Sequence, residues 1–332
     1  MSMMENDSLF CNNEFPSVPS SFLTDNFIST LTPYHITAIT CHAIAFITFT
    51  VSTLTGNLSQ VDKLWSILPC VYAWMCVVDS RTKLMAILST LWSVRLTYNF
   101  YRRGGYTWPK VWLGEEDYRW SILRQGKLGG VWSLLTNKWV MVVFNVVFIS
   151  LMQNWLLLWI ATPSLVAWSA AMRAKHCTEQ YPDFSAALNA YDALASILFL
   201  TSLVIETIAD NQQYKFQSKK SLQKQPKDHF CTTGLFSIVR KPNYAAEQFI
   251  WFSFYIFSAA ASSSFWNWSG GGIISLVILF QGSGWLTEQI TSAKYPEYVE
   301  YQRVVPLYVP NVFALISGKQ SKELAVLKNK RI

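Results

Sequence analysis

Residues 234–251 read GLFSIVRKPNYAAEQFIW, so charged and amide side chains stand directly at the head of an apolar run. A similar junction, LTEQITSAKYPEYVEYQRVVPLYVP, occupies residues 286–310, and ETIADNQQYKFQ at 206–217 closes another apolar run. Ionisable side chains near hydrocarbon are costly, and they usually mark a functional site. We therefore expect the chain to be organised around residues 206–303.

The composition is typical of a polytopic membrane protein. Apolar residues make up 51% of the 332 positions, and only 14% are charged, which is too apolar for a soluble domain of this length. About 20 helical residues cross the ~30 Å hydrocarbon core of a bilayer. We predict an all-α fold with seven transmembrane helices, over residues 34–54, 61–78, 84–101, 139–160, 188–209, 245–261 and 271–286.

Three connections between these predicted spans are long. Residues 102–138 mix cations, acids and tryptophans, so we expect them to lie at the headgroup level. Residues 162–187 are predicted to form a polar connection that dips into the interface, and residues 211–230 to form a lysine-rich loop. Within the third span, Arg95 and Asn99 are four residues apart and share a face that must point into the bundle or towards water.

The distribution of charge predicts the orientation. No Lys or Arg precedes Lys63, whereas the later connections and the C-terminal tail are basic. The positive-inside rule therefore places the N-terminus in the lumen and the C-terminus in the cytosol. We expect a disordered luminal tail (1–33), a single transmembrane domain (34–310) whose cofactor half is 188–310, and a basic cytosolic tail (311–332).

The last five residues suggest a location. Lys328 and Lys330 form a K-x-K-x-x pattern at the extreme C-terminus, which is typical of a retrieval signal read by a receptor. On a cytosolic tail, this signal favours the endoplasmic reticulum.

Four motifs occur in order along the chain. They are G-E-x-D-Y-R-W (114–120), A-D-x-Q-x-x-x-F (209–216), G-L-F-x-x-x-R-x-P-N-Y-x-x-E (234–247) and Y-x-x-Y-x-x-x-V-P (298–306). Together they resemble the steroid 5-alpha-reductase and isoprenylcysteine methyltransferase superfamily, and most closely its DUF1295 branch.

The resemblance implies a membrane-embedded oxidoreductase that uses NADPH to reduce a C=C bond in a lipid or steroid-like substrate. It also implies that the residues matching Asp210, Asn243, Tyr244 and Glu247 line the NADPH cavity.

The residues themselves suit a dinucleotide. Such a ligand needs cations for its phosphates, rings on which to stack, and acceptors for its ribose hydroxyls. Basic, aromatic and carboxylate side chains occur together in the C-terminal half. The candidate cofactor-binding residues are Asp210, Arg240, Lys241, Asn243, Tyr244, Glu247, Glu288, Tyr298, Tyr301 and Arg303.

Purely structural roles are open for several of these residues. Asn243, after a proline, suits the cap of a helix beginning near Ala245. Glu247 suits the first turn of that helix, where a carboxylate complements the dipole. An aromatic belt at the membrane interface would suit Tyr295, Tyr298 and Tyr301.

The catalytic residues are less defined. The steroid 5-alpha-reductases use a Glu/Tyr pair from their N-terminal half, and no clear counterpart occurs here, which places a steroid enone substrate in doubt. Tyr106 and Glu116 are the candidates that the sequence offers for proton donation. The histidines and cysteines do not cluster, so no metal site is expected.

Two other functions are compatible with the motifs. One is an S-adenosylmethionine-dependent methyltransferase of the isoprenylcysteine class, since P-N-Y-x-x-E also resembles that branch. The other is a non-enzymatic membrane protein that binds lipid or sterol. In each case the expected partners are the bilayer and a hydrophobic small molecule, with no nucleic acid and no specified oligomeric state.

Overall fold

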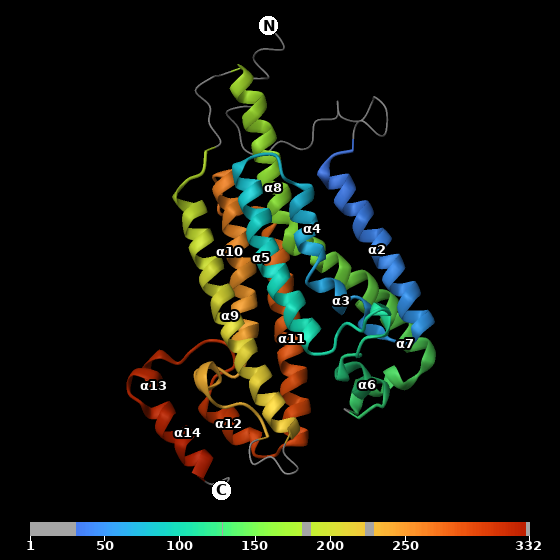
Figure 1. Cartoon of the computed structure of the whole chain (residues 1–332), viewed down its shortest axis with the longest axis vertical. Coiled ribbons are helices and arrows are strands. Elements are labelled where there is room, and N and C mark those ends of the chain that lie inside the picture. Colours follow the sequence, from blue (N-terminus) through green and yellow to red (C-terminus); the bar gives the residue numbers. More distant parts are fainter. Residues whose placement is uncertain (1–30, 128, 181–186, 223–228, 330–332) are drawn as a thin grey trace.

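The chain folds into a bundle of long helices with a group of short helices at one end (Figure 1). The computed structural model describes residues 31–127, 129–180, 187–222 and 229–329, and no β-strand occurs within these ranges. The all-α prediction is confirmed for them. Most of the predicted luminal tail, and the end of the predicted retrieval signal, lie outside the described residues.

The long helices are α2 (Pro33–Thr55), α5 (Ser80–Arg102), α8 (Gln153–Gln180), α9 (Ala190–Leu222), α10 (Pro242–Ser262) and α11 (Gly270–Lys294). The short α-helices are α3 (Asp62–Trp65), α4 (Leu68–Met75), α6 (Tyr118–Arg124), α7 (Lys138–Phe144), α12 (Tyr298–Val304), α13 (Val312–Ile316) and α14 (Lys319–Asn329). The remaining helical segments are η2 (Leu58–Gln60), η3 (Val111–Leu113), η4 (Gly130–Thr136), η5 (Asn145–Met152, a π-helix) and η6 (Gly234–Ser237).

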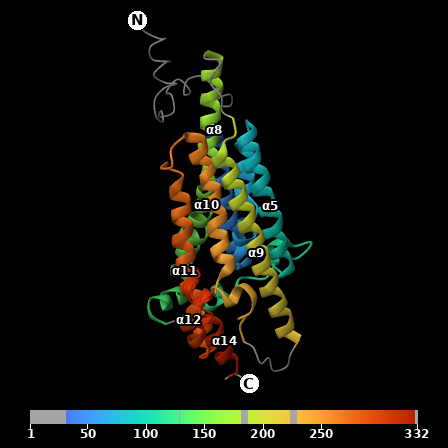
Figure 2. The same cartoon turned by 90° about the vertical axis from the view of Figure 1, so that its left-hand side faces the viewer.

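Helix α10 is the centre of the bundle. It packs along α9, and its other faces contact α8, α11 and α5 (Figures 1 and 2). Aromatic side chains fill the space between these helices, and Trp92 of α5 meets Trp251 of α10 edge to face, with ring centroids 4.8 Å apart. This arrangement brings the ends of α5, α9 and α10 that carry polar residues to one level of the molecule.

Four helical stretches are long and apolar enough to cross a membrane, namely Pro33–Thr55, Lys138–Lys175, Ala190–Leu222 and Gly270–Lys294. They correspond to four of the seven predicted spans, which supports a membrane protein. The other three predicted spans, at 61–78, 84–101 and 245–261, are not among them. The count of seven and the orientation of the termini remain predictions.

The character of α5 and α10 explains why they differ from the four apolar stretches. Helix α5 carries Arg81, Lys83, Arg95 and Arg102, so it is amphipathic and cationic rather than uniformly apolar. Helix α10 has 12 buried residues among its 21, because neighbouring helices surround it. Both helices meet their neighbours through polar or aromatic side chains that a lipid-facing helix would not carry.

The predicted helix over 61–78 is wrong as a continuous element. The segment consists of α3 and α4, and Pro69 occupies the first turn of α4. A proline has no N–H, so it cannot donate to Trp65 one turn earlier, and the helix restarts at Leu68. As a result, α3 turns towards α6, and Asp62 at its start lines a cavity that is described below.

The predicted polar connection over 162–187 is also wrong in its first part, because α8 continues to Gln180. Pro163 lies inside this helix and leaves the carbonyl of Trp159 without its usual donor. The Thr162 hydroxyl donates to that carbonyl at 2.6 Å, and Ser169 donates to the carbonyl of Leu165 at 3.0 Å. Two of the hydroxyls that made the segment look like a loop, those of Thr162 and Ser169, are therefore satisfied within the helix.

The predicted lysine-rich loop begins later than expected, since α9 runs to Leu222. Its 33 residues correspond to about 50 Å, well beyond the hydrocarbon thickness. Lysine and glutamine are good helix formers, and contacts with the segment after residue 229 stabilise this extension. Gln212 accepts from the N–H of Leu235 at 2.9 Å, and Lys220 donates to the carbonyl of His229 at 2.6 Å.

Candidate functional site

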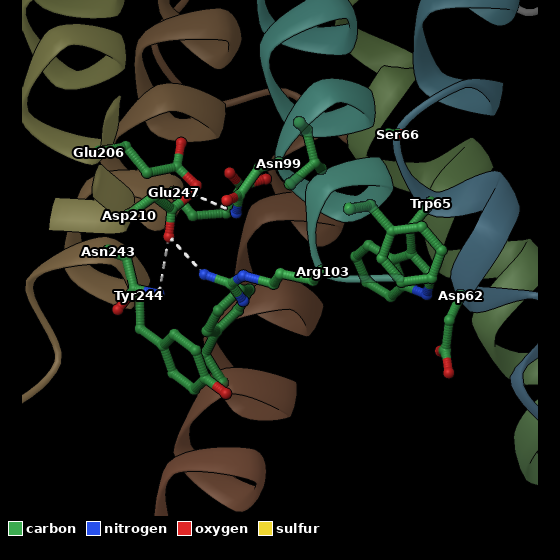
Figure 3. A pocket seen from close by; sticks show the side chains of 13 residues that line it. Asp62, Trp65, Ser66, Asn99, Arg103, Glu206, Asp210, Asn243, Tyr244 and Glu247 are labelled. Atoms are coloured by element: carbon green, nitrogen blue, oxygen red, sulfur yellow. Dashed lines mark hydrogen bonds and ion pairs between the residues drawn. The ribbon is translucent and has the colours of Figure 1, made fainter. Parts of the chain in front are cut away.

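Three helices each contribute a pair of polar residues four positions apart to a single cluster. Residues at this spacing lie on one helix face, one turn apart. The pairs are Arg95 and Asn99 on α5, Glu206 and Asp210 on α9, and Asn243 and Glu247 on α10. Figure 3 shows several of these side chains converging on one side of a pocket. The sequence expectation that Arg95 and Asn99 face into the bundle is confirmed.

Arg95 lies between the carboxylates of the other two helices. Its Nη2 is 2.6 Å from Oε2 of Glu206 and 3.6 Å from Oε2 of Glu247. Its Nη1 donates to Oδ2 of Asp210 at 2.7 Å. Each of the three carboxylate side chains is at most 7% exposed. Arg95 thus compensates buried negative charge from two helices at once.

Asp210 is the most highly bonded member of the cluster. Besides Arg95, it accepts from Asn99 Nδ2 at 2.7 Å, Arg103 Nη2 at 3.3 Å and Asn243 Nδ2 at 3.4 Å. The last two bonds are long, and the Arg103 side chain is 44% exposed. Arg103 and Asn243 can therefore give up their weak hydrogen bonds to Asp210 and bind a ligand instead, at a small cost in free energy.

Glu247 is held by two indoles. Trp92 Nε1 donates to both of its oxygens at 3.0 and 3.1 Å, and Trp251 Nε1 donates to Oε1 at 2.9 Å. The charge-assisted bonds fix this carboxylate in the aromatic core. Glu247 lies in the second turn of α10, which begins at Pro242, so the helix-dipole interpretation is wrong.

The position of Asn243 also excludes the capping interpretation. The N-cap of α10 is Lys241, and no side chain caps this helix end. Asn243 is instead the second helical residue, and its carboxamide points to Asp210.

A small cavity of about 220 Å³ adjoins this cluster. Glu206, Asp210, Asn243, Tyr244 and Glu247 line one part of it. Figure 3 shows Asp62 and Trp65 across the pocket from them, with Trp65 between Asp62 and Arg103.

A second cavity of about 1900 Å³ shares Asp62, Trp65, Arg103, Asn243 and Tyr244 with the small one. One part of its wall is apolar and aromatic, with Phe148, Trp155, Trp159 and Leu279 from the η5–α8 and α11 helices. Another part carries cations, which are Arg103, Arg119, Lys220, Arg240, Lys241 and Lys294. The cavity therefore offers both cationic and apolar side chains to a ligand, and Tyr244 contacts one of each, Lys241 and Phe280.

A separate polar network lies between α11, α12 and the segment before α10. The Nε of Arg240 donates to Oε2 of Glu288 at 2.8 Å, and Tyr298 donates to Oε1 of Glu288 at 2.5 Å. Arg240 also donates to the carbonyls of Gln302 and Val305. Tyr301 donates to the carbonyl of Phe236. This network joins α11 and α12 to the segment that leads into the N-terminus of α10.

The structure therefore divides the ten predicted cofactor-binding residues. Asp210, Asn243, Tyr244 and Glu247 line the small cavity, and Lys241 lines the large one beside the ring of Tyr244, 5.7 Å from its centroid. Arg240, Glu288, Tyr298 and Tyr301 form the network, in which most of their polar atoms already have protein partners. The large cavity is also lined by Arg240, Tyr298 and Tyr301. Arg303 is exposed on α12 and lines neither cavity. Direct contact of these last five with a cofactor stays a prediction.

Of the two predicted catalytic residues, Glu116 lines the large cavity and Tyr106 lines neither cavity. Tyr106 donates to the carbonyl of Lys63 at 2.6 Å, and burial raises the pKa of its phenol. Glu116 lines the large cavity, accepts from the N–H of Leu58 at 2.8 Å and pairs with Arg124. Both residues hold the segment of residues 56–66 against the segment that follows α5, and proton donation by either stays a prediction.

Several site residues were missed from the sequence. Asp62 lines both cavities, and burial, followed by the charge of Asp117, raises the pKa of its carboxyl. Arg119 lines the large cavity and donates to both oxygens of Asp117 at 2.9 and 2.8 Å. Arg103 follows Arg95 and Asn99 at the same four-residue spacing, and this repeat was the available signal. No signal in the sequence indicated that Asp62 faces a cavity.

Comparison with known proteins supports a single family. The family model described as "Protein of unknown function (DUF1295)" matches residues 48–305. An uncharacterized protein of Schizosaccharomyces pombe is 34% identical over 309 residues, which covers 86% of this chain and 82% of that protein. No solved structure matches the chain. Family membership over most of its length, together with the helical membrane-type fold, shows that the chain belongs to the DUF1295 family.

Proposed function

We propose that this protein is a membrane-embedded oxidoreductase that uses NADPH to reduce a C=C bond in a lipid-like substrate. The observation that carries the proposal is the cavity of about 1900 Å³, whose lining includes both cationic and apolar side chains. Tyr244 contacts one of each kind, Lys241 and Phe280. Pockets for one small ligand usually measure about 300–1000 Å³. The larger volume suits two ligands that meet end to end.

The residues present fit a reduced nicotinamide dinucleotide. Asn243 has a half-buried carboxamide with one long bond, so it can pair with the carboxamide of a nicotinamide ring. Asp210 accepts from ribose hydroxyls or amides, while Arg103 and Lys241 provide positive charge for phosphate oxygens. When bound, NADPH supplies the hydride, and the protein aligns the reacting groups and excludes water.

The aromatic wall fits a hydrophobic substrate. Trp155, Trp159 and Phe148 belong to the stretch 138–175, which is apolar enough to cross a membrane. A lipid-like molecule that enters from the bilayer would meet this wall first and would bury its chain against it. The polar groups near Tyr244 would then orient its reactive end.

S-adenosylmethionine is smaller than a dinucleotide and carries no phosphate, so it would not use the charges of Arg103 and Lys241. Titration of the purified, detergent-solubilised protein with NADPH and with S-adenosylmethionine tests the proposal, and mass spectrometry of co-purifying lipids identifies the substrate class. We expect saturable binding of NADPH. Binding of S-adenosylmethionine alone would favour a methyltransferase, and binding of neither would favour a non-enzymatic lipid-binding protein.

A further inference from the structure

We propose that Lys220 and Lys294 bind the phosphate monoester on the adenosine ribose, which distinguishes NADPH from NADH. This assignment rests on the proposed function and adds a specificity site to it. Neither lysine was predicted from the sequence as a cofactor ligand. Both line the cavity of about 1900 Å³ that also reaches Asn243 and Tyr244.

The two ammonium groups gather around one ring. Nζ of Lys220 is 4.8 Å from the centroid of Tyr295, and Nζ of Lys294 is 5.3 Å from the same centroid. Lys220 also donates to the Tyr295 hydroxyl at 3.0 Å. The hydrogen bond from Lys220 is the main cause that lowers the pKa of this phenol, and both lysine charges add to it.

This positive charge is not neutralised within the described chain. Among the described residues, neither Lys220 nor Lys294 has a carboxylate within 4.0 Å, whereas the nearby Glu297 pairs with His229 at 2.6 Å. Like charges brought together without a counter-ion repel each other. A dianionic phosphate monoester would remove this repulsion and accept charge-assisted hydrogen bonds from both ammonium groups.

The geometry of Lys220 leaves it able to bind. A lysine ammonium has three donors, and two of them go to the His229 carbonyl and the Tyr295 hydroxyl. These two bonds hold the side chain in place, so its remaining donor is available to a ligand at small entropic cost. Lys294 is exposed and lines the cavity, and its ammonium group lies 5.3 Å from the centroid of the Tyr295 ring.

The position along the bundle also suits one extended dinucleotide. Asp210 and Lys220 are ten residues apart on α9, which corresponds to about 15 Å along the helix axis. Asn243 and Asp210 would contact the nicotinamide end, and Lys241 lies on the wall that continues towards the lysine pair. One ligand that runs along the cavity would therefore place its two ends at these two clusters.

A phosphate monoester could also come from phosphatidic acid, since α9 and α11 both meet the membrane criterion. We assign the site to the nucleotide because both lysines line the same cavity as Asn243 and Tyr244. The probes are NADPH, NADH, 2′,5′-ADP and 5′-ADP, each titrated against the full-length protein in a neutral detergent. Nanodiscs of phosphatidylcholine with or without phosphatidic acid provide the lipid arm.

The variants are Lys220→Gln, Lys294→Gln and the double variant, with Lys319→Gln as the matched control. Lys319 is exposed on α14 and pairs only weakly, at 3.9 Å, with Glu323. We expect wild type to prefer NADPH over NADH, and 2′,5′-ADP over 5′-ADP, by about tenfold or more. The double variant should lose this preference while its NADH affinity stays close to wild type. Lys294→Gln alone should reduce the preference for NADPH in part, and it leaves the hydrogen bond from Lys220 to the His229 carbonyl in place.

Equal wild-type affinity for NADPH and NADH would overturn the assignment and leave the nicotinamide site standing. Retained selectivity in the double variant would do the same. Specific binding of phosphatidic acid that depends on both lysines, without any 2′-phosphate preference, would transfer the site to a lipid. If none of the nucleotides binds, both the proposed function and this assignment are wrong.

Discussion

Arg95 of α5 and Asp210 of α9 are 115 positions apart in the chain, and their Nη1 and Oδ2 atoms lie 2.7 Å from each other. Arg95 reaches Glu206 as well, one turn earlier on α9. The pair therefore fixes the lateral position of α5 against α9 at the level of the small cavity. A single buried guanidinium both stabilises the bundle and shapes the wall to which a ligand would bind.

Replacing Arg95 with Ala should destabilise the protein by about 3–5 kcal/mol, because it leaves buried carboxylates without their charge partner. Arg95→Lys should cost less, since it keeps the charge but loses the two-branched geometry. Lys83→Ala is the control, as Lys83 is exposed on the same helix. Thermal unfolding in detergent measures all three. Equal melting temperatures for Arg95→Ala and Lys83→Ala would contradict the structural role.

Asn243→Ala should weaken NADPH binding by about 1–3 kcal/mol, the usual cost of removing a buried hydrogen-bond partner. Asn243→Asp should weaken it further, because the new carboxylate would face Asp210, which Asn243 now contacts at 3.4 Å. Glu247→Gln tests the charge at nearly constant shape. Asn311→Ala is the control, since Asn311 caps α13 away from both cavities. Unchanged NADPH affinity in both Asn243 variants would remove the residue from the site.

Trp92→Phe and Trp251→Phe should each destabilise the fold by about 1.5–3 kcal/mol, because each removes one N–H that Glu247 accepts. In a Glu247→Gln background the effect of each tryptophan change should shrink, since the acceptor is then neutral. The double-mutant cycle isolates this coupling. Additive changes in melting temperature would show that the indoles stabilise the protein by packing alone.

Asp62 should make stability depend on pH. Its pKa in the folded protein is raised, first by burial and then by the charge of Asp117, while Arg119 opposes the shift. The stabilisation from a raised carboxyl pKa is fully present below the unfolded pKa of about 4 and is lost as pH rises through the folded value. Asp62→Asn should therefore raise the melting temperature at pH 7 relative to wild type and have little effect near pH 4. A constant difference between the two proteins over this range would contradict the argument.

Orientation can be tested through the two sequons at Asn57 and Asn267. With a luminal N-terminus, Asn57 is cytosolic, and its side chain is also engaged with the Gly114 carbonyl at 2.8 Å. We expect no glycosylation at Asn57, protection of a tag at Met1 and digestion of a tag at Ile332 in sealed microsomes. The opposite protease pattern would reverse the orientation and move the proposed cofactor site to the lumen.

The long helices were largely predictable, because apolar runs of membrane length at 34–54, 188–209 and 271–286 leave few alternatives to a helix. Two of the failures, at 61–78 and 162–187, share one physical cause. Pro69 breaks a helix that hydropathy alone continues, whereas Pro163 is tolerated because Thr162 takes over the carbonyl of Trp159. Hydropathy does not record whether a neighbouring hydroxyl can satisfy the backbone.

The candidate site was predictable in part. Asp210, Asn243 and Glu247 stand at the ends of apolar runs, and the structure brings them together. Glu288 and Tyr298 stand at similar ends, yet they bond to Arg240 and to each other. Both groups have the same sequence signature, and only the packing of α11 and α12 gives Glu288 and Tyr298 their protein partners, while Tyr298 lines the large cavity as well.

The sequence by itself determined that this protein is helical, membrane-type and related to the DUF1295 family, because composition, periodicity and motif order are properties of the chain. It also determined which residues share a helix face, since the spacing of Arg95 and Asn99 follows from 3.6 residues per turn. Only the tertiary structure decided what each face meets. Asp62, Lys220 and Lys294 line one cavity because helices remote in sequence pack side by side, and spacing along one helix carries no information about its neighbours.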